Sequence, residues 1–77
     1  MNVTISKHAL ERMDQRGISE AEVRLAFDTE SWDSVDVSSV DETILIVTKT
    51  FNGKKWHFLY NYETSTLVTC YPKRRRK

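Results

Sequence analysis

The sequence predicts an α+β fold in which two N-terminal helices pack on one face of a three- to four-stranded antiparallel β-meander. Two helix patterns meet at Gly17, and Asn52-Gly53 separates two runs rich in β-branched and aromatic residues. A third such run ends at Tyr71. The 77 residues suffice for one hydrophobic core. We therefore expect a single domain over residues 1–72, followed by a basic C-terminal tail over residues 73–77.

Capping residues predict both helices. Ser6 is a plausible N-cap for the first helix, and Gly17 suits the left-handed conformation that ends a helix. Ser19 and Glu22 have the spacing of a capping box, so we expect the second helix to begin directly after Ser19. Its apolar stripe consists of Val23, Ala26 and Phe27. From Thr29 to Asp36 the chain is polar and acidic, as in a connector, and leads into a short strand around Val35, Val37 and Val40.

The clearest β signal is a hairpin formed by residues 43–51 and 54–62. A type I′ turn at Asn52-Gly53 fixes its register. The expected cross-strand pairs are Phe51 with Lys54, Lys49 with Trp56, Val47 with Phe58, and Leu45 with Tyr60. A second turn near Thr64-Ser65 would return residues 67–71 beside the hairpin.

The two faces of this sheet differ in character. We expect the helices to cover the face formed by Ile44, Ile46, His57, Leu59, Val68 and Cys70. The opposite face would then present Trp56, Phe58, Tyr60, Thr69 and Tyr71, with Lys49 and Lys54 at the turn end. Aromatic and cationic side chains on one surface can stack bases and hold phosphates. The alternative is that these aromatic residues are half-buried strand residues covered by the connector, by its Trp32 or by a partner chain.

Charge is unevenly distributed along the chain. Residues 1–72 hold seven Lys/Arg against eleven Asp/Glu, a net charge of −4, whereas residues 73–77 are all basic. Such a tail is typical of nucleic-acid binding, although a solubilising or disordered end has the same composition. The single Cys70 excludes an internal disulfide, and it forms no metal-ligand spacing with the two histidines. With no signal-peptide pattern and no apolar run of roughly 20 residues, we expect a cytoplasmic protein without membrane contact.

The first helix places one histidine and two arginines at four-residue intervals. His8, Arg12 and Arg16 are therefore neighbours along one helix face. Histidine transfers protons near neutral pH, and arginine offers a fork of donors that matches phosphate oxygens. The stripe is also compatible with a solvated face on which Arg12 pairs with a carboxylate of Glu11, Asp14 or Glu30.

Three segments, His8–Met13, Arg16–Ser19 and Leu67–Pro72, give the chain a family resemblance. It resembles a small bacterial family known as domain of unknown function 4258, which is similar to RelE-like and barnase/EndoU-type ribonuclease toxins. The resemblance covers nearly the whole chain except residues 28–42. Unlike RelE-type toxins, the part before residue 73 is acidic and lacks a cluster of lysines and arginines in the expected sheet, so ribosome-dependent cleavage is not implied.

This resemblance implies a small metal-independent endoribonuclease of the toxin type. His8 and Tyr71 would transfer protons, Arg12 would stabilise the transition state, and Thr69 would hydrogen-bond phosphate or ribose. The nucleic-acid-binding residues would be Arg16, Lys49, Lys54, Trp56, Lys73, Arg74, Arg75 and Arg76. His57 is expected to be structural, and Cys70 to be an inert core thiol.

The interpretation as a toxin-type endoribonuclease also implies binding partners. RNA and an antitoxin protein are expected partners, and no cofactor or metal is implied. The alternative function is a non-catalytic nucleic-acid- or protein-binding module of the same fold. An exposed edge strand in so small a domain also suits a homodimer.

Overall fold

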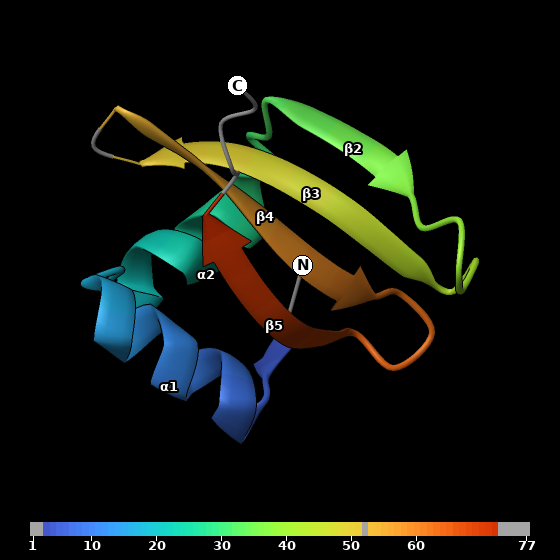
Figure 1. Cartoon of the computed structure of the whole chain (residues 1–77), viewed down its shortest axis with the longest axis horizontal. Coiled ribbons are helices and arrows are strands. Elements are labelled where there is room, and N and C mark those ends of the chain that lie inside the picture. Colours follow the sequence, from blue (N-terminus) through green and yellow to red (C-terminus); the bar gives the residue numbers. More distant parts are fainter. Residues whose placement is uncertain (1–2, 52, 73–77) are drawn as a thin grey trace.

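The computed structural model describes residues 3–51 and 53–72 of the chain. It confirms the α+β class (Figure 1). In chain order the elements are β1 (Thr4–Ile5), α1 (Lys7–Arg16), α2 (Glu20–Thr29), β2 (Ser34–Val37), β3 (Ile44–Phe51), β4 (Lys54–Asn61) and β5 (Thr66–Pro72). Asn52 of the expected turn and the tail over residues 73–77 lie outside the described residues.

The sheet has five strands in the order β1-β5-β4-β3-β2. Strands β2 to β5 form the expected antiparallel meander, but β1 pairs in parallel with β5. The prediction of a purely antiparallel sheet of three to four strands is therefore wrong. Only two residues form β1, which is too short to show a strand pattern in the sequence. It is held by hydrogen bonds from Thr4 N to Ser65 O (2.8 Å) and from Ser6 N to Leu67 O (3.0 Å).

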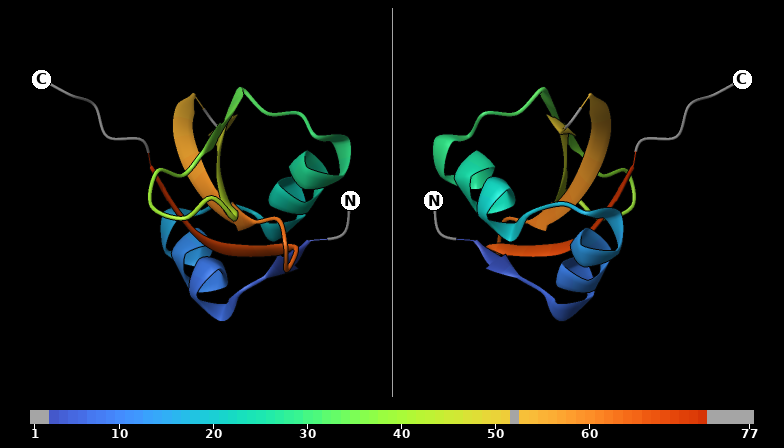
Figure 2. Two further views of the ribbon diagram at one scale, coloured as in Figure 1. Left: turned by 90° about the vertical axis from the view of Figure 1, so that its right-hand side faces the viewer. Right: turned by 90° about the vertical axis from the view of Figure 1, so that its left-hand side faces the viewer.

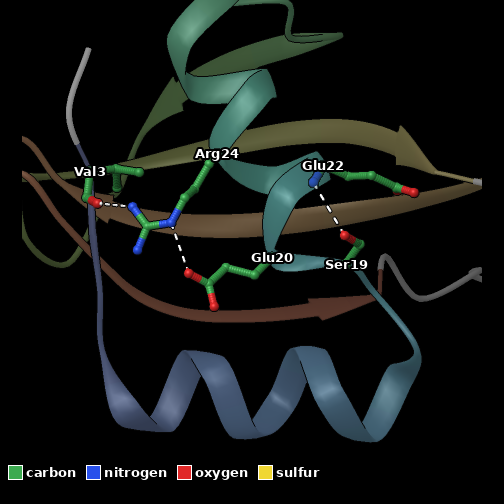
Figure 3. Close-up of polar contacts among 5 residues, drawn as sticks. All are labelled: Val3, Ser19, Glu20, Glu22 and Arg24. Carbon is green, nitrogen blue, oxygen red and sulfur yellow. Dashed lines mark hydrogen bonds and ion pairs between the residues drawn. The ribbon is translucent and has the colours of Figure 1, made fainter.

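Helix α1 begins and ends, and α2 begins, where the capping residues predict; α2 ends at the C-cap Glu30, whose φ of 52° no sequence signal indicated. The Ser6 hydroxyl accepts a hydrogen bond from Ala9 N (3.1 Å), and Gly17 ends α1 with φ of 71°. The Ser19 hydroxyl accepts from Glu22 N (3.4 Å) at the start of α2 (Figure 3). Ser6 also donates its hydroxyl to Val68 O (2.8 Å), which fastens the start of α1 to β5.

The hairpin register is confirmed, whereas the prediction of which sheet face is buried is wrong. The four predicted pairs, Phe51–Lys54, Lys49–Trp56, Val47–Phe58 and Leu45–Tyr60, are all present. However, the buried face is the one that bears Trp56, Phe58 and Tyr60, which are 4%, 1% and 5% exposed and belong to one core cluster with buried residues of both helices. Phe27 of α2 packs against the ring of Trp32 (centroids 4.5 Å apart) and that of Tyr60 (5.1 Å). The large aromatic side chains therefore form the core, because their burial removes the most apolar surface from water.

A β-bulge determines which side chains of β5 lie on each face of the sheet. The register shifts between Leu59 and Tyr60, so that Cys70 pairs with Phe58, and Tyr71 pairs with His57. Directly paired residues lie on the same face of a sheet, and a shift by one residue moves the following side chains to the other face. Cys70 is therefore buried in the core, and Thr69 and Tyr71 share the outer face with His57. The burial of Cys70 and the outer position of Thr69 and Tyr71 are as predicted, but their neighbours are not: Cys70 shares its face with Phe58 and not with Leu59, and Tyr71 shares its face with His57 and not with Trp56.

The two helices lie against different parts of the curved sheet. Figure 2 shows α2 over the inner side of β3 and β4 and α1 alongside β5. Arg24 of α2 donates from Nη1 to Val3 O (2.8 Å) and from Nε to Glu20 Oε2 (2.8 Å), which connects α2 to the segment that enters β1 (Figure 3). Neither helix is long or apolar enough to cross a bilayer.

Candidate functional site

A cleft of about 290 Å³ lies between the C-terminal half of α1 and the end of β5. Its lining residues are Arg12, Arg16, Thr69, Cys70, Tyr71 and Pro72. Residues near opposite ends of the sequence meet here because Ser6 fastens α1 to β5, and because Ala9 and Met13 of α1 are buried in the core. The fold thus brings together four of the residues that the sequence singles out: Arg12, Arg16, Thr69 and Tyr71.

The two arginines of this cleft are exposed, and neither has a carboxylate partner among the residues that the structure describes. Within residues 3–51 and 53–72, neither Arg12 nor Arg16 makes a hydrogen bond or an ion pair. Arg24, by contrast, is bonded to Glu20 and to Val3 O. The structure therefore contradicts the alternative in which Arg12 pairs with Glu11, Asp14 or Glu30. Two unpaired guanidinium groups favour the binding of an anion with several oxygens, such as a phosphate.

Cys70 lies at the base of the same cleft and is buried. Burial raises the pKa of its thiol, and the nearby charges of Arg12 and Arg16 oppose that rise. The thiol is therefore protonated at neutral pH, which agrees with the expected inert core cysteine.

Tyr71 connects the cleft to a histidine that the sequence analysis treats as structural. The ring of Tyr71 is 42% exposed, and its centroid lies 5.4 Å from that of His57 on the neighbouring strand. His57 Nδ1 is 3.0 Å from the hydroxyl of Thr48, which is buried. The hairpin register already places Thr48 opposite His57, but only the bulge brings Tyr71 to the same face. His57 is thus a candidate for proton transfer that the sequence pattern does not indicate.

A second cleft of about 160 Å³ lies beside the first. Its lining residues are Arg16, Gly17, Ile18, Glu22, Phe51, Lys54 and Trp56. Arg16 lines both clefts, and Lys54 Nζ lies 5.9 Å from the centroid of the Trp56 ring. Because Trp56 is 4% exposed, it cannot offer a ring face to a stacked base, and its predicted role in stacking is wrong. Arg16 and Lys54 extend the positively charged surface from the first cleft.

Other predicted site residues lie elsewhere. His8 is exposed on α1, one turn before Arg12, and does not line either cleft. Lys49 donates to the Ser31 hydroxyl (3.4 Å) and lines a separate hollow beside α2. The predicted basic residues Lys73, Arg74, Arg75 and Arg76 lie outside the described residues. Among the residues that the structure describes, no group of three or more His, Cys, Asp or Glu side chains is placed to hold a metal ion.

Comparison with known proteins identifies the family of the chain. No curated protein and no solved structure matches the chain. The model of one family, described as a domain of unknown function, matches residues 5–72. This match extends from the second residue of β1 to the last residue of β5 and includes every residue of the cleft. The chain therefore belongs to the DUF4258 family.

Proposed function

We propose that the protein is a small endoribonuclease that binds the phosphodiester backbone of RNA in the cleft between α1 and β5. The supporting observation is that Arg12 and Arg16, which have no carboxylate partner within the described part of the chain, line this cleft together with Thr69 and Tyr71. Guanidinium groups supply charge-assisted hydrogen bonds to phosphate oxygens, and the two hydroxyl groups can donate to phosphate or ribose.

The reaction that these residues suit is intramolecular transesterification. A base removes the proton from the ribose 2′-OH, the 2′-oxygen attacks the adjacent phosphorus, and the bond from phosphorus to the 5′-oxygen breaks. An acid gives a proton to that 5′-oxygen, which leaves a 2′,3′-cyclic phosphate. Arg12 stabilises the charge that develops on the phosphorane, and one preorganised donor of this kind contributes about 3 to 4 kcal/mol.

Three side chains compete for the two proton-transfer roles. His8 lies on the same helix face as Arg12, Tyr71 lines the cleft, and His57 lies against Tyr71. Acid–base assistance accelerates a reaction by about 10² to 10⁴, so the loss of one such group cripples cleavage without abolishing it. We assign the first role to His8 and the second to Tyr71 with His57 beside it.

This activity fits a toxin of the RelE-like or barnase/EndoU-type group, held inactive in its host by an antitoxin protein. In that setting residues 73–77 supply five positive charges that raise the affinity for RNA, while the cleft positions the scissile bond.

The test is cleavage of a mixed-sequence RNA by the full chain in EDTA. Wild type is compared with Arg12→Gln, His8→Ala and His57→Ala, and with Lys55→Gln as a matched control, because Lys55 is exposed and lines neither cleft. Cleavage that Arg12→Gln loses and Lys55→Gln retains supports the proposal. Equal cleavage by all variants, or no cleavage by the wild type, contradicts it.

A second candidate is a module that binds RNA in this cleft without cleaving it. The position of His8 outside the cleft favours this function, because a general base must lie within hydrogen-bonding reach of the proton that it removes. RNA binding that depends on Arg12 and Arg16, without cleavage and without dependence on His8, would identify this module.

A further inference from the structure

Among the strands that the structure describes, β2 ends the sheet at the edge opposite to the cleft, and its outer edge has no neighbouring strand. Strand β2 is the last strand of the sheet, and within the described residues it pairs only with β3. Ser38 N donates to Ile44 O (2.9 Å), and Val37 pairs with Leu45. Because hydrogen-bonded and non-hydrogen-bonded pairs alternate in an antiparallel ladder, the N–H and C=O groups of Val35 and Val37 point away from β3. This edge can accept a further strand.

Apolar surface lies directly beside this edge. Val35 and Val37 are 47% and 62% exposed, although both belong to a strand. Their cross-strand partners, Val47 and Leu45, lie on the inner face of the sheet, so both valine side chains lie on that face as well. A hollow of about 170 Å³ adjoins them and is lined by Phe27, Glu30, Trp32, Val35, Leu45, Val47 and Tyr60. An incoming strand would therefore meet apolar surface at every second residue.

The charge around the edge is strongly negative. Residues 28–42 contain six acidic residues and no lysine or arginine: Asp28, Glu30, Asp33, Asp36, Asp41 and Glu42. All six are exposed. Lys49 of β3 contacts this segment through a hydrogen bond to the Ser31 hydroxyl (3.4 Å). A second copy of β2 would bring Asp36 and its neighbours against the same acids, and such like-charge contacts oppose pairing. The charge pattern thus disfavours a homodimer through this edge and favours a basic partner.

We infer that the outer edge of β2 binds an extended segment of a partner protein in which aliphatic and basic residues alternate. Backbone groups of Val35 and Val37 pair with that segment, its aliphatic side chains cover the two valines and enter the adjacent hollow, and its basic side chains face Asp36 and the flanking acids. This is recognition by strand addition, in which backbone hydrogen bonds give affinity and alternate side chains give specificity. The surface is separate from the α1–β5 cleft and does not depend on any ribonuclease activity.

The probe is a short capped peptide of alternating lysine and valine, added to the ¹⁵N-labelled full chain. Chemical-shift changes should be largest at the amides of Val35 and Val37, and the affinity should fall as salt is added. Val37→Pro removes an N–H that points outward and leaves the ladder with β3 intact. We expect it to weaken binding about tenfold, the effect of one strong hydrogen bond. Val37→Thr keeps both the N–H and the branched shape and is the matched control.

Two further comparisons separate strand addition from simple charge attraction. A peptide of the same composition with its lysines and valines in two blocks should bind weakly, and Asp36→Asn should reduce affinity for the alternating peptide. The inference is overturned if both peptides bind equally, if Val37→Pro with a well-dispersed spectrum binds as the wild type does, or if the alternating peptide does not bind. Arg12→Gln with Arg16→Gln should leave peptide binding unchanged, so failure at the cleft and failure at this edge are distinguishable.

Discussion

The salt dependence of RNA binding should decrease by a definite amount when the two arginines of the cleft lose their charge. Each phosphate that a protein neutralises on a single strand contributes about −0.7 to the slope of log K against log salt concentration. Arg12 and Arg16 both line the α1–β5 cleft and have no carboxylate partner in the described part of the chain. If each binds one phosphate, the double variant Arg12→Gln/Arg16→Gln should have a slope that is less negative by about 1.4.

The assay is fluorescence anisotropy with a labelled 2′-O-methyl RNA, which cannot react through its 2′-oxygen and therefore reports binding alone. Over a fourfold increase in salt, the double variant should lose about sevenfold less affinity than the wild type loses. Both proteins keep residues 73–77, so the difference between their slopes isolates the cleft from the tail. Lys55→Gln gives the slope change expected from an exposed cation outside the clefts.

An unchanged slope in the double variant would refute the reasoning, because it would mean that neither guanidinium contacts a phosphate. A slope change equal to that of Lys55→Gln would also refute it, since the effect would then follow from net charge and not from the cleft.

Three further predictions concern the fold around the site. Trp56→Ala should reduce the free energy of unfolding by about 3 to 5 kcal/mol in urea titrations, because Trp56 is 4% exposed, and near-wild-type stability would contradict its place in the core. Because burial raises the pKa of the Cys70 thiol, the folded state favours the neutral thiol, so the free energy of unfolding should decline as pH rises above the pKa of the unfolded thiol. In urea titrations Cys70→Ser should lose that decline. Rapid alkylation of Cys70 by iodoacetamide at pH near 8 without urea would contradict its burial. In Gly17→Ala the added Cβ meets no atom within 4 Å, but the residue must keep its φ of 71°. Backbone strain alone should therefore lower the free energy of unfolding by about 1 kcal/mol in thermal unfolding. An unchanged free energy of unfolding would show that the α1 C-cap rearranges.

Local signals in the sequence determine the helices and the central hairpin. Ser6 and Gly17 fix both ends of α1, and Ser19 fixes the start of α2, because their side chains or backbone freedom satisfy groups within a few residues. The Asn52-Gly53 signal in the sequence predicts one alignment of the two runs that it separates, and β3 and β4 pair in that register. The stripe of His8, Arg12 and Arg16 likewise follows from helix periodicity, which also made the two cleft arginines recognisable in advance.

Only the tertiary structure decides which side of the sheet is buried and what faces the cleft. Both faces of the hairpin are apolar enough to pack against helices, so alternation in the sequence does not choose between Trp56 and Ile46. The bulge between Leu59 and Tyr60 then reverses the faces of β5, and a one-residue shift leaves no trace in a hydrophobic pattern of period two. For this reason Tyr71 lies beside His57, and Cys70, which the sequence already places in the core, packs there on the face of Phe58. These are long-range contacts, whose formation depends on the packing of the whole core and not on the sequence around any one of the residues.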